Sequence, residues 1–390
     1  MKTRFLATMS HDIRTPLNGI IGMVNMGNQY ADDPQMQQKI REKVMESLKY
    51  LVSLVNDVLD MNKLQSGDLK DQQLLFDLTM VLRELNQIYD ERAAKKGIRY
   101  EIDWKSTYSH SALVGNPVYL GRILSNIMDN AIKFSQAGSV ITVWVEEETL
   151  DDGRAIFTFY CKDQGVGMSE DFIAHAFDMF SQESKTSRSR YEGTGLGLAI
   201  TKQFVDRMDG SIELKSKAGV GTTVIVKIPF KIGTQDKNSN LSDKPVSLDD
   251  YSVEGMRALV VEDNELNMEI SRCILEDSGM EVTCAVDGQE AVEIFEKSAP
   301  DYFGVIYMDI MMPRMNGLDA ARTIREMKRR DARRVPIIAM SANAFAEDII
   351  NSRLAGMNVH LAKPLDAEKM IVALKQCMAD NSDVKLHEDL

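Results

Sequence analysis

The sequence predicts a multidomain chain that begins with a helical hairpin, continues as a mixed α/β domain and ends as a doubly wound α/β domain of the flavodoxin-like type. Residues 1–66 repeat apolar side chains at steps of three and four. Residues 75–230 alternate strand and helix patterns around three glycine clusters, and residues 255–380 alternate short apolar runs with amphipathic helices. Residues 233–254 are polar and predict a linker, and residues 381–390 predict a polar tail.

The composition excludes several classes of protein. The chain has 390 residues, enough for two or three domains, and its 46 Lys+Arg against 59 Asp+Glu give a net charge of −13. This acidic balance argues against binding to nucleic acid, so we expect no nucleic-acid partner. No apolar run approaches the roughly 20 residues of a membrane span. Four scattered Cys without a C-x-x-C pair and five isolated His exclude a disulfide scaffold and the usual zinc sites.

The helical hairpin is expected over residues 1–70. Asp33 can cap the second helix with Pro34 at its first position, and Gly67 can end it. The two helices offer too little surface to bury their own apolar stripes, so we expect a homodimer in which two hairpins form a four-helix bundle. The alternative is a hairpin that packs on the rest of its own chain. The stripes are Leu6, Met9, Ile13, Leu17, Ile20 and Val24, then Ile40, Val44, Leu48, Leu51, Val55 and Val58.

His11 lies off the apolar stripe and is expected to face solvent beside Asp12. The surrounding segment, residues 5–18, resembles the H-box of sensor histidine kinases. The resemblance implies that His11 accepts a phosphoryl group. Asp12 would orient the imidazole and take its proton, and Thr15, one turn further, would position water for a reverse phosphatase reaction.

A second candidate site combines a polar helix face with the glycine clusters. The helix expected over residues 117–134 places Asn126, Asn130 and Lys133 on one face, which in isolation is as well explained by solvation. Glycines allow backbone N–H groups to converge on phosphate oxygens, and a helix that starts near Gly197 adds its positive end. A Rossmann turn is disfavoured because the segment before Gly193 is polar, and no Gly-Lys-Ser/Thr of a Walker loop follows.

The order and spacing of these motifs resemble the ATP-binding domain of histidine kinases, a two-layer α/β sandwich shared with Hsp90-like, MutL-like and gyrase-like ATPases. We expect this domain over residues 71–232. The resemblance implies that Asp163 reads the adenine amino group and that Asn130 holds Mg²⁺. Gln164 departs from the Thr more usual there. The implied ATP site is Asn126, Asn130, Lys133, Asp163, Gly165, Gly167, Gly193, Thr194, Gly195, Leu196, Gly197, Gly221 and Thr222, under a lid of residues 181–192 whose Arg188 or Arg190 contacts phosphate.

Polar residues follow each strand predicted in the last domain. Strand patterns at 257–261, 305–308, 337–340 and 359–362 end in Glu262 and Asp263, Asp309, Ser341 and Lys363. Ligands of parallel sheets bind at the carboxyl ends of the strands, where three carboxylates would need a cation such as Mg²⁺. The alternative reading is that Glu262 and Asp263 cap the start of a helix.

This pattern resembles a response-regulator receiver domain, expected over residues 255–380. The resemblance implies that Asp309 becomes phosphorylated. It also implies that Glu262, Asp263, Asp309 and the carbonyl of Met311 hold Mg²⁺, and that Lys363 and Ser341 contact the phosphoryl group. His360 stands where the family usually has Tyr or Phe, and the Lys363–Pro364 bond is expected to be cis.

Together the resemblances predict a hybrid histidine kinase of a two-component phosphorelay. ATP would phosphorylate His11, and the group would pass to Asp309 and then to a downstream histidine phosphotransfer protein or response regulator. Two alternatives are a receiver-centred interaction module charged by another kinase and an Hsp90-like or MutL-like ATPase. We expect the chain in the cytoplasm. Because only ten residues precede His11, we expect a fragment or an unusual start, with attachment to the inner membrane left to a missing N-terminal region.

Overall fold

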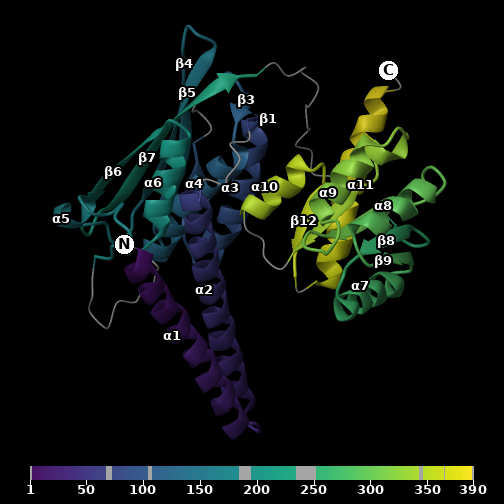
Figure 1. Ribbon diagram of the computed structural model, residues 1–390, viewed down its shortest axis with the longest axis horizontal. Coiled ribbons are helices and arrows are strands. Elements are labelled where there is room, and N and C mark those ends of the chain that lie inside the picture. The colour runs from purple at the N-terminus through teal and green to yellow at the C-terminus, as the bar shows by residue number, and fades with distance from the viewer. Residues whose placement is uncertain are drawn as a thin grey trace. The chain divides into compact units, whose positions relative to one another are not determined.

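The computed structural model describes residues 2–66, 73–103, 108–183, 195–233, 252–341, 346–363 and 365–388. Within these ranges, it does not describe the side chains of residues 2–12, 49, 53, 56, 59, 60, 62–66, 346 and 379–388. The chain divides into two compact units, Met1–Thr234 and Gln235–Leu390 (Figure 1).

The first unit begins with the predicted hairpin, formed by α1 (Lys2–Gln29) and α2 (Pro34–Ser66) (Figure 1). Asp33 caps α2 as expected, because its Oδ1 accepts hydrogen bonds from the backbone N–H groups of Gln35 and Met36 at 3.1 and 3.0 Å. The Gln37 amide donates to the carbonyl of Gly27 at 2.6 Å and so ties the turn to α1.

The hairpin is followed by a seven-stranded mixed sheet in the order β1-β3-β7-β5-β4-β2, with β6 paired to β7. Among its described strands only β2 and β4 pair in parallel. Helices α3 (Leu78–Lys95), α4 (Pro117–Phe134) and α6 (Gly197–Arg207) form the second layer, and α5 (Glu170–Ile173) is short (Figure 1). The predicted two-layer sandwich is therefore confirmed. The strands are β1 Leu74–Asp77, β2 Arg99–Ile102, β3 Ala112–Gly115, β4 Val140–Thr149, β5 Arg154–Asp163, β6 Ser211–Lys217 and β7 Gly221–Ile232.

Local sequence explains where α4 begins and which side of the sheet it covers. Asn116 caps the helix through a hydrogen bond from the backbone N–H of Tyr119, and Pro117 occupies the first position. Alternate residues of the central strands, such as Val143, Phe157 and Val226, are buried. The core of this domain therefore lies between one face of the sheet and the helices.

The second half of α2 packs against this domain. Arg122 on α4 forms an ion pair with Asp57 at 3.2 Å, and the two side chains are only 14% and 10% exposed. Leu54 and Met61 on α2 are fully buried. Part of the apolar surface of the hairpin is therefore covered by its own chain, as the alternative to the dimer had supposed.

The second unit is a five-stranded parallel sheet in the order β12-β11-β10-β8-β9. Renumbered within the unit, this is the 2-1-3-4-5 order of a doubly wound flavodoxin-like sheet, so that prediction is confirmed. Helix α11 continues through Glu388, into residues predicted as a tail. The elements are β8 Arg257–Val261, α7 Glu265–Asp277, β9 Glu281–Ala285, α8 Gly288–Lys297, β10 Val305–Asp309, α9 Gly317–Glu326, η2 Asp331–Arg333, β11 Ile337–Ser341, α10 Ala346–Leu354, β12 Val359–Ala362 and α11 Ala367–Glu388.

Sequence reasoning found four of these strands and missed β9. This strand lies at the edge of the sheet and pairs only with β8 among the described strands. Its residues read Glu-Val-Thr-Cys-Ala, and three of the five are half-buried. Glu281 and Thr283 interrupt the apolar run of this strand, which is why the pattern was weak.

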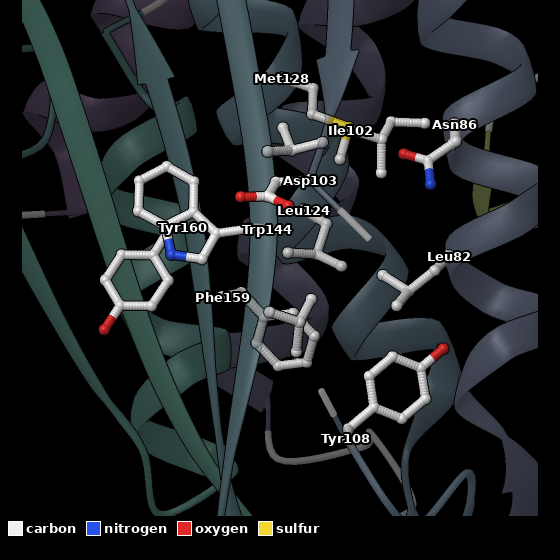
Figure 2. Close-up of a pocket in the computed structure, with 12 residues that line it drawn as sticks. Leu82, Asn86, Ile102, Asp103, Tyr108, Leu124, Met128, Trp144, Phe159 and Tyr160 are labelled. Atoms are coloured by element: carbon white, nitrogen blue, oxygen red, sulfur yellow. The ribbon is translucent and has the colours of Figure 1, made fainter. Parts of the chain in front are cut away.

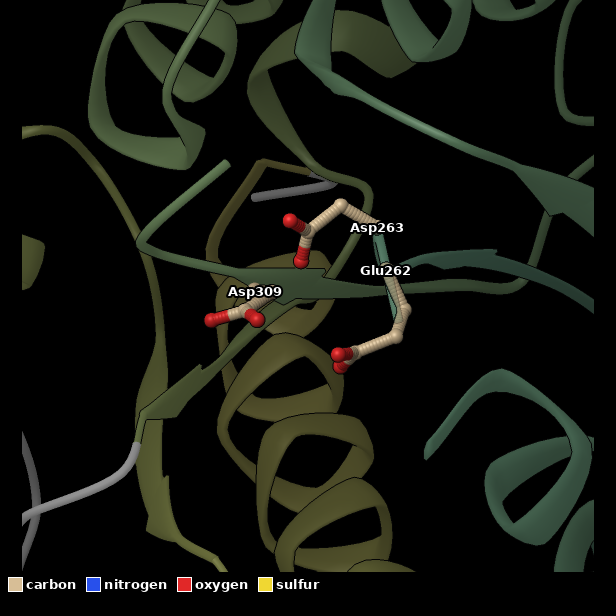
Figure 3. A group of neighbouring side chains, drawn as sticks. All are labelled: Glu262, Asp263 and Asp309. Atoms are coloured by element: carbon tan, nitrogen blue, oxygen red, sulfur yellow. The ribbon is translucent and has the colours of Figure 1, made fainter. Parts of the chain in front are cut away.

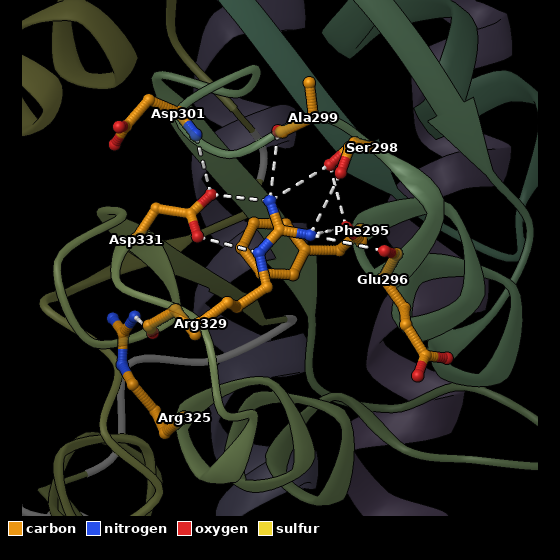
Figure 4. A network of polar contacts seen from close by, with 9 residues as sticks. Phe295, Glu296, Ser298, Ala299, Asp301, Arg325, Arg329 and Asp331 are labelled. Carbon is orange, nitrogen blue, oxygen red and sulfur yellow. Dashed lines mark hydrogen bonds and ion pairs between the residues drawn. The ribbon is translucent and has the colours of Figure 1, made fainter.

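Arg329 forms hydrogen bonds with the loop that connects α8 to β10 (Figure 4). Its guanidinium donates to both carboxylate oxygens of Asp331 at 2.7 Å and to the carbonyls of Phe295, Ser298 and Ala299. Its central carbon lies 4.4 Å from the centre of the Phe295 ring. These contacts tie the end of α8 and the two residues that follow it to Asp331.

Candidate functional site

Asp163 occupies the end of β5, where the sequence predicted an adenine-reading carboxylate. Its side chain is 8% exposed, and its Oδ1 accepts hydrogen bonds from the backbone N–H groups of Gly165 and Thr222 at 2.7 and 3.2 Å. Burial raises the pKa of the Asp163 carboxyl, although the two backbone donors act in the opposite direction. A buried acceptor held in this way is suited to bind one specific donor group.

The glycines near Asp163 have a steric role of their own. A Cβ on Gly165 would lie 2.7 Å from the carbonyl oxygen of Phe134, at the end of α4. Gly167 and Gly221 have φ angles of +65° and +131°, and a Cβ on Gly221 would collide with the Asp163 carbonyl. Glycine at these positions therefore lets the ends of β5, β7 and α4 approach one another around Asp163.

Helix α4 brings its predicted polar face to the start of α6. The Asn126 amide lies 3.3 Å from Thr201 Oγ1 and 3.5 Å from the carbonyl oxygen of Gly197, so it joins the two helices. Asn130 lies one turn further along α4 and is half-buried. The Lys133 ammonium lies 4.9 Å from the centre of the Phe134 ring.

The other residues of the predicted ATP site differ in what the structure shows of them. The Leu196 side chain is fully buried, so contact with a ligand there would fall to its backbone. Gly195 adopts a φ of +68° just before α6, and Thr222 Oγ1 lies 2.8 Å from Ser216 Oγ. Gly193, Thr194, Arg188 and Arg190 lie outside the described residues, as does most of the predicted lid.

A small cavity between α3, α4 and the sheet is distinct from this site (Figure 2). Its volume is about 40 Å³, and Leu82, Leu124, Met128 and Phe159 contribute to an apolar lining. Such a volume suits water molecules and is far too small for a nucleotide. The stacked rings of Trp144 and Tyr160 beside it are 4.5 Å apart.

The predicted phosphoacceptor lies on α1. The helix includes His11 and Asp12, whose side chains are outside the described part of the chain. Thr15 is described and exposed. The backbone therefore places all three residues on a single helix, as the sequence predicted.

Three carboxylates meet at the carboxyl ends of β8 and β10 (Figure 3). One oxygen from each of Glu262, Asp263 and Asp309 lies within 4.8 Å of the others, and Glu262 and Asp309 are buried. Hard oxygen donors in this arrangement fit a Mg²⁺ ion. The capping alternative is wrong, because Asn264 caps α7 by accepting hydrogen bonds from Leu266 and Asn267.

Lys363 joins two of these carboxylates. Its Nζ lies 2.5 Å from Glu262 Oε2 and 2.6 Å from Asp309 Oδ2. Burial works to lower the pKa of the Lys363 ammonium, but the hydrogen bonds to Asp309 and Glu262 outweigh it and raise that pKa. The lysine therefore carries its charge where a phosphoryl group on Asp309 would need a cation.

Two further residues around Asp309 were missed by sequence reasoning. Asn267 donates its side-chain amide to Glu262 Oε1 at 2.9 Å and so orients that carboxylate. A Cβ on Gly317 would collide with the carbonyl of Asp309, which explains the glycine at the start of α9. Met311, predicted to offer its carbonyl to Mg²⁺, donates its backbone N–H to Asp309 Oδ1 at 3.2 Å.

Ser341 at the end of β11 lies close to His360 on β12. Ser341 Oγ is 2.8 Å from His360 Nε2, and Ser352 Oγ is 3.2 Å from His360 Nδ1. The predicted switch position is therefore bonded directly to the serine expected to contact the phosphoryl group. The cis peptide predicted before Pro364 falls on a residue outside the described ones.

Three family models match successive parts of the chain. Residues 1–67 match the His Kinase A (phospho-acceptor) domain, and residues 115–232 match the histidine kinase-, DNA gyrase B- and HSP90-like ATPase. Residues 258–375 match the response regulator receiver domain. The models therefore occur in the order that the sequence motifs predicted.

Curated relatives cover nearly the whole chain. It is 30% identical to the sensory/regulatory protein RpfC of Xanthomonas campestris over 96% of its length and 54% of the relative. It is 31% identical to the autoinducer 2 sensor kinase/phosphatase LuxQ of Vibrio parahaemolyticus over 93% of its length and 41% of the relative. The aerobic respiration control sensor protein ArcB of Escherichia coli is 30% identical over 96% of the chain and 46% of the relative.

The chain thus spans about half the length of the relatives it matches. Among the helices that the structure describes, none is both long and apolar enough to cross a membrane.

Proposed function

Because the chain belongs to the hybrid histidine kinases, we propose that it transfers the γ-phosphoryl group of ATP to His11 and from there to Asp309. The observation that carries this proposal is the charge arrangement at Asp309. The buried carboxylate there shares the ammonium of Lys363 with a second buried carboxylate, Glu262. Such a site suits a nucleophile that must accept an anionic group.

The first step is an attack by a ring nitrogen of His11 on the γ-phosphorus of ATP. The bond between that phosphorus and the bridging oxygen breaks, and ADP leaves with the electron pair. Asp12 takes the proton from the imidazole. Asp163 binds the adenine amino group. Asn126 and Lys133 on the polar face of α4 surround the phosphates together with the glycine segments near the start of α6.

In the second step, a carboxylate oxygen of Asp309 attacks the phosphorus on His11, and the nitrogen–phosphorus bond breaks. Lys363 then pairs with a phosphoryl oxygen, and Ser341 donates a hydrogen bond to another. Thr15 positions water for the reverse phosphatase reaction. Asn130 at the nucleotide, and Glu262, Asp263, Asp309 and the Met311 carbonyl at the receiver, would hold Mg²⁺, which would supply charge neutralisation.

The chain would work as a homodimer and pass its phosphoryl group to a histidine phosphotransfer protein or response regulator. Leu17, Val24, Leu48 and Val55 on the hairpin are between 39% and 50% exposed, and a second hairpin would cover them. The four free cysteines support a reducing cytoplasmic setting, with attachment to the inner membrane supplied by a region outside this chain.

Labelling with Mg²⁺ and γ-labelled ATP tests the order of transfer. We expect Asp309→Ala to retain label that is acid-labile and base-stable, as a phosphohistidine is, and His11→Gln to lose all label. His110→Gln is the matched control, since His110 pairs with Glu147 away from the proposed chemistry. Label on Asp309 that appears in the His11 variant only when a partner kinase is added would instead support the receiver-centred module. ATP hydrolysis without any phosphoprotein would support the Hsp90-like ATPase.

A further inference from the structure

His360 bridges the phosphorylation site and α10. It stands on β12 next to β11, and its two ring nitrogens contact two serines, Ser341 at the end of β11 and Ser352 on α10. Ser341 is 5% exposed and Ser352 is 1% exposed. The two serine hydroxyls are therefore buried, whereas His360 is half-buried, and a hydrogen bond of either serine has a cost if it is broken without replacement.

The direction of each hydrogen bond follows from the number of hydrogens. Ser352 Oγ donates its only hydrogen to the carbonyl of Ile349 at 2.8 Å. His360 Nδ1 must therefore donate to Ser352 Oγ. A neutral imidazole carries one N–H, so Nε2 is an acceptor, and the hydroxyl of Ser341 donates to it. The single hydroxyl hydrogen of Ser341 is thus directed at His360.

We propose that His360 is a positioning residue that withholds the Ser341 hydroxyl from a phosphoryl group on Asp309 and links its release to α10. This inference rests on the proposed function of Asp309. Ser341 has one hydrogen and can give it either to His360 or to a phosphoryl oxygen, but not to both. Phosphorylation would therefore remove the Ser341 hydrogen bond from Nε2, and the ring would move or change its bond to Ser352.

The identity of the side chain at position 360 matters for this coupling. A phenylalanine has no ring nitrogen, so it neither accepts from Ser341 nor donates to Ser352. With histidine, the resting state gains a hydrogen bond that the phosphorylated state must give up. The expected result is a receiver that binds the phosphoryl group less readily, and in which α10 responds when it does so.

Binding of beryllofluoride with Mg²⁺ to the full chain, measured by fluorine NMR, tests the coupling without the kinase. Losing one hydrogen bond from the resting state should make His360→Phe bind about fivefold more tightly. Ser341→Ala should bind more weakly than the wild type. The double variant should match Ser341→Ala, because His360 acts only through the Ser341 hydroxyl. Equal affinities for wild type and His360→Phe, or a His360 effect that persists without the hydroxyl, would overturn the proposal.

Ser352→Ala gives a second, smaller perturbation. Without that acceptor the ring can carry its hydrogen on Nε2, donate to Ser341 and leave the serine hydrogen free, so affinity should rise roughly twofold to threefold. Amide exchange of Ala346–Leu354 should speed up roughly threefold when beryllofluoride binds the wild type and stay constant in Ser352→Ala. Unchanged affinity in Ser352→Ala, or an unresponsive α10 in the wild type, would contradict the coupling.

Asp309→Ala separates this inference from the proposed function. Beryllofluoride binding that is present in the wild type and lost in Asp309→Ala upholds the receiver chemistry, whatever His360→Phe does. Absence of Asp309-dependent binding in the wild type would overturn both.

Discussion

The Lys363 ammonium balances the charge of two buried carboxylates. Removing it should therefore lower the free energy of unfolding by an amount that depends on whether Mg²⁺ is bound. Its ammonium contacts both Glu262 and Asp309, and the latter two are 1% and 6% exposed. Because the pKa of Lys363 is raised, its stabilising contribution is complete below the ordinary lysine pKa. It is lost only as the pH rises through the raised value, in the alkaline range.

We expect Lys363→Met to lower the free energy of unfolding of the receiver by about 3 kcal/mol, because the two carboxylates then repel each other without a cation. Millimolar Mg²⁺ should restore part of the loss. Urea unfolding, monitored through the amide hydrogen exchange of β10, measures both the loss of stability and its recovery with Mg²⁺. Lys297→Met, on an exposed i,i+4 pair with Glu293, is the control and should change little. A variant that Mg²⁺ does not rescue would contradict metal binding by these carboxylates.

Asp163 presents the opposite case, a buried carboxylate that costs stability until it binds a ligand. Its pKa is raised chiefly by burial, so the penalty of its charge is absent below the ordinary aspartate pKa and complete above the raised value. We expect Asp163→Asn to be neutral or stabilising at pH 7 and to lose that gain in acid.

The same substitution should weaken ATP binding by roughly 10- to 100-fold. The asparagine carbonyl oxygen would keep the hydrogen bonds from Gly165 and Thr222, and its NH₂ would meet the adenine amino group donor to donor. Thermal unfolding and titration with a fluorescent ATP analogue test the two effects separately. Unchanged affinity would exclude Asp163 as the adenine acceptor.

At the scale of the elements, arginine side chains join neighbouring segments by donating hydrogen bonds to backbone carbonyls near the ends of helices. Arg329 does so between α8 and β10, where its guanidinium serves several carbonyls and Asp331 while only 14% exposed (Figure 4). Arg325 nearby is half-buried and donates to the carbonyls of Ala332 and Gly356, and desolvation lowers its pKa to about 10.

Arg329→Ala is expected to destabilise the receiver by about 3 kcal/mol, because it leaves Asp331 and the end of α8 without their charged donor. The midpoint of the urea transition at β10 should fall accordingly. Arg322→Ala removes an exposed i,i+3 pair with Asp319 and should cost no more than about 0.5 kcal/mol. Similar losses in the two variants would mean that the Arg329 network contributes little.

At the scale of the whole molecule, the open question of assembly concerns the hairpin. Its second helix is partly covered by α4 and α6 through Leu54, Asp57 and Met61, yet Leu17 and Val24 on α1 remain exposed. Both packing alternatives therefore account for part of the apolar surface, and the uncovered part is what a second hairpin would bury.

Val24→Glu should weaken the dimer roughly a hundredfold, because each assembly would bury two unpaired carboxylates. Sedimentation equilibrium measures the dissociation constant. Lys39→Glu, an exposed position on α2, changes charge without entering the apolar stripe and should leave the constant nearly unchanged. A wild-type chain that sediments as a monomer would exclude the hairpin dimer.

Much of the fold could be predicted because its signals are local. The apolar periodicity of α1, the cap and proline that start α4, and the apolar runs that end in polar residues are all read from neighbouring positions. The same holds for Asp309 and Asp163, which stand in contiguous motifs. Strand β9 was missed because Glu281 and Thr283 interrupt its apolar run, and Asn267 was missed because nothing near it in sequence indicates that it orients Glu262.

Contacts between distant residues required the folded chain. Lys363 is 101 residues from Glu262 and 54 from Asp309, and it reaches both because parallel strands end at one edge of the sheet. The hydrogen-bond direction from Ser341 to His360 depends on Ser352 and Ile349, which belong to helix α10. Residue type and local pattern are properties of the sequence, whereas the partner of a buried polar atom depends on which segments packing brings within about 3 Å.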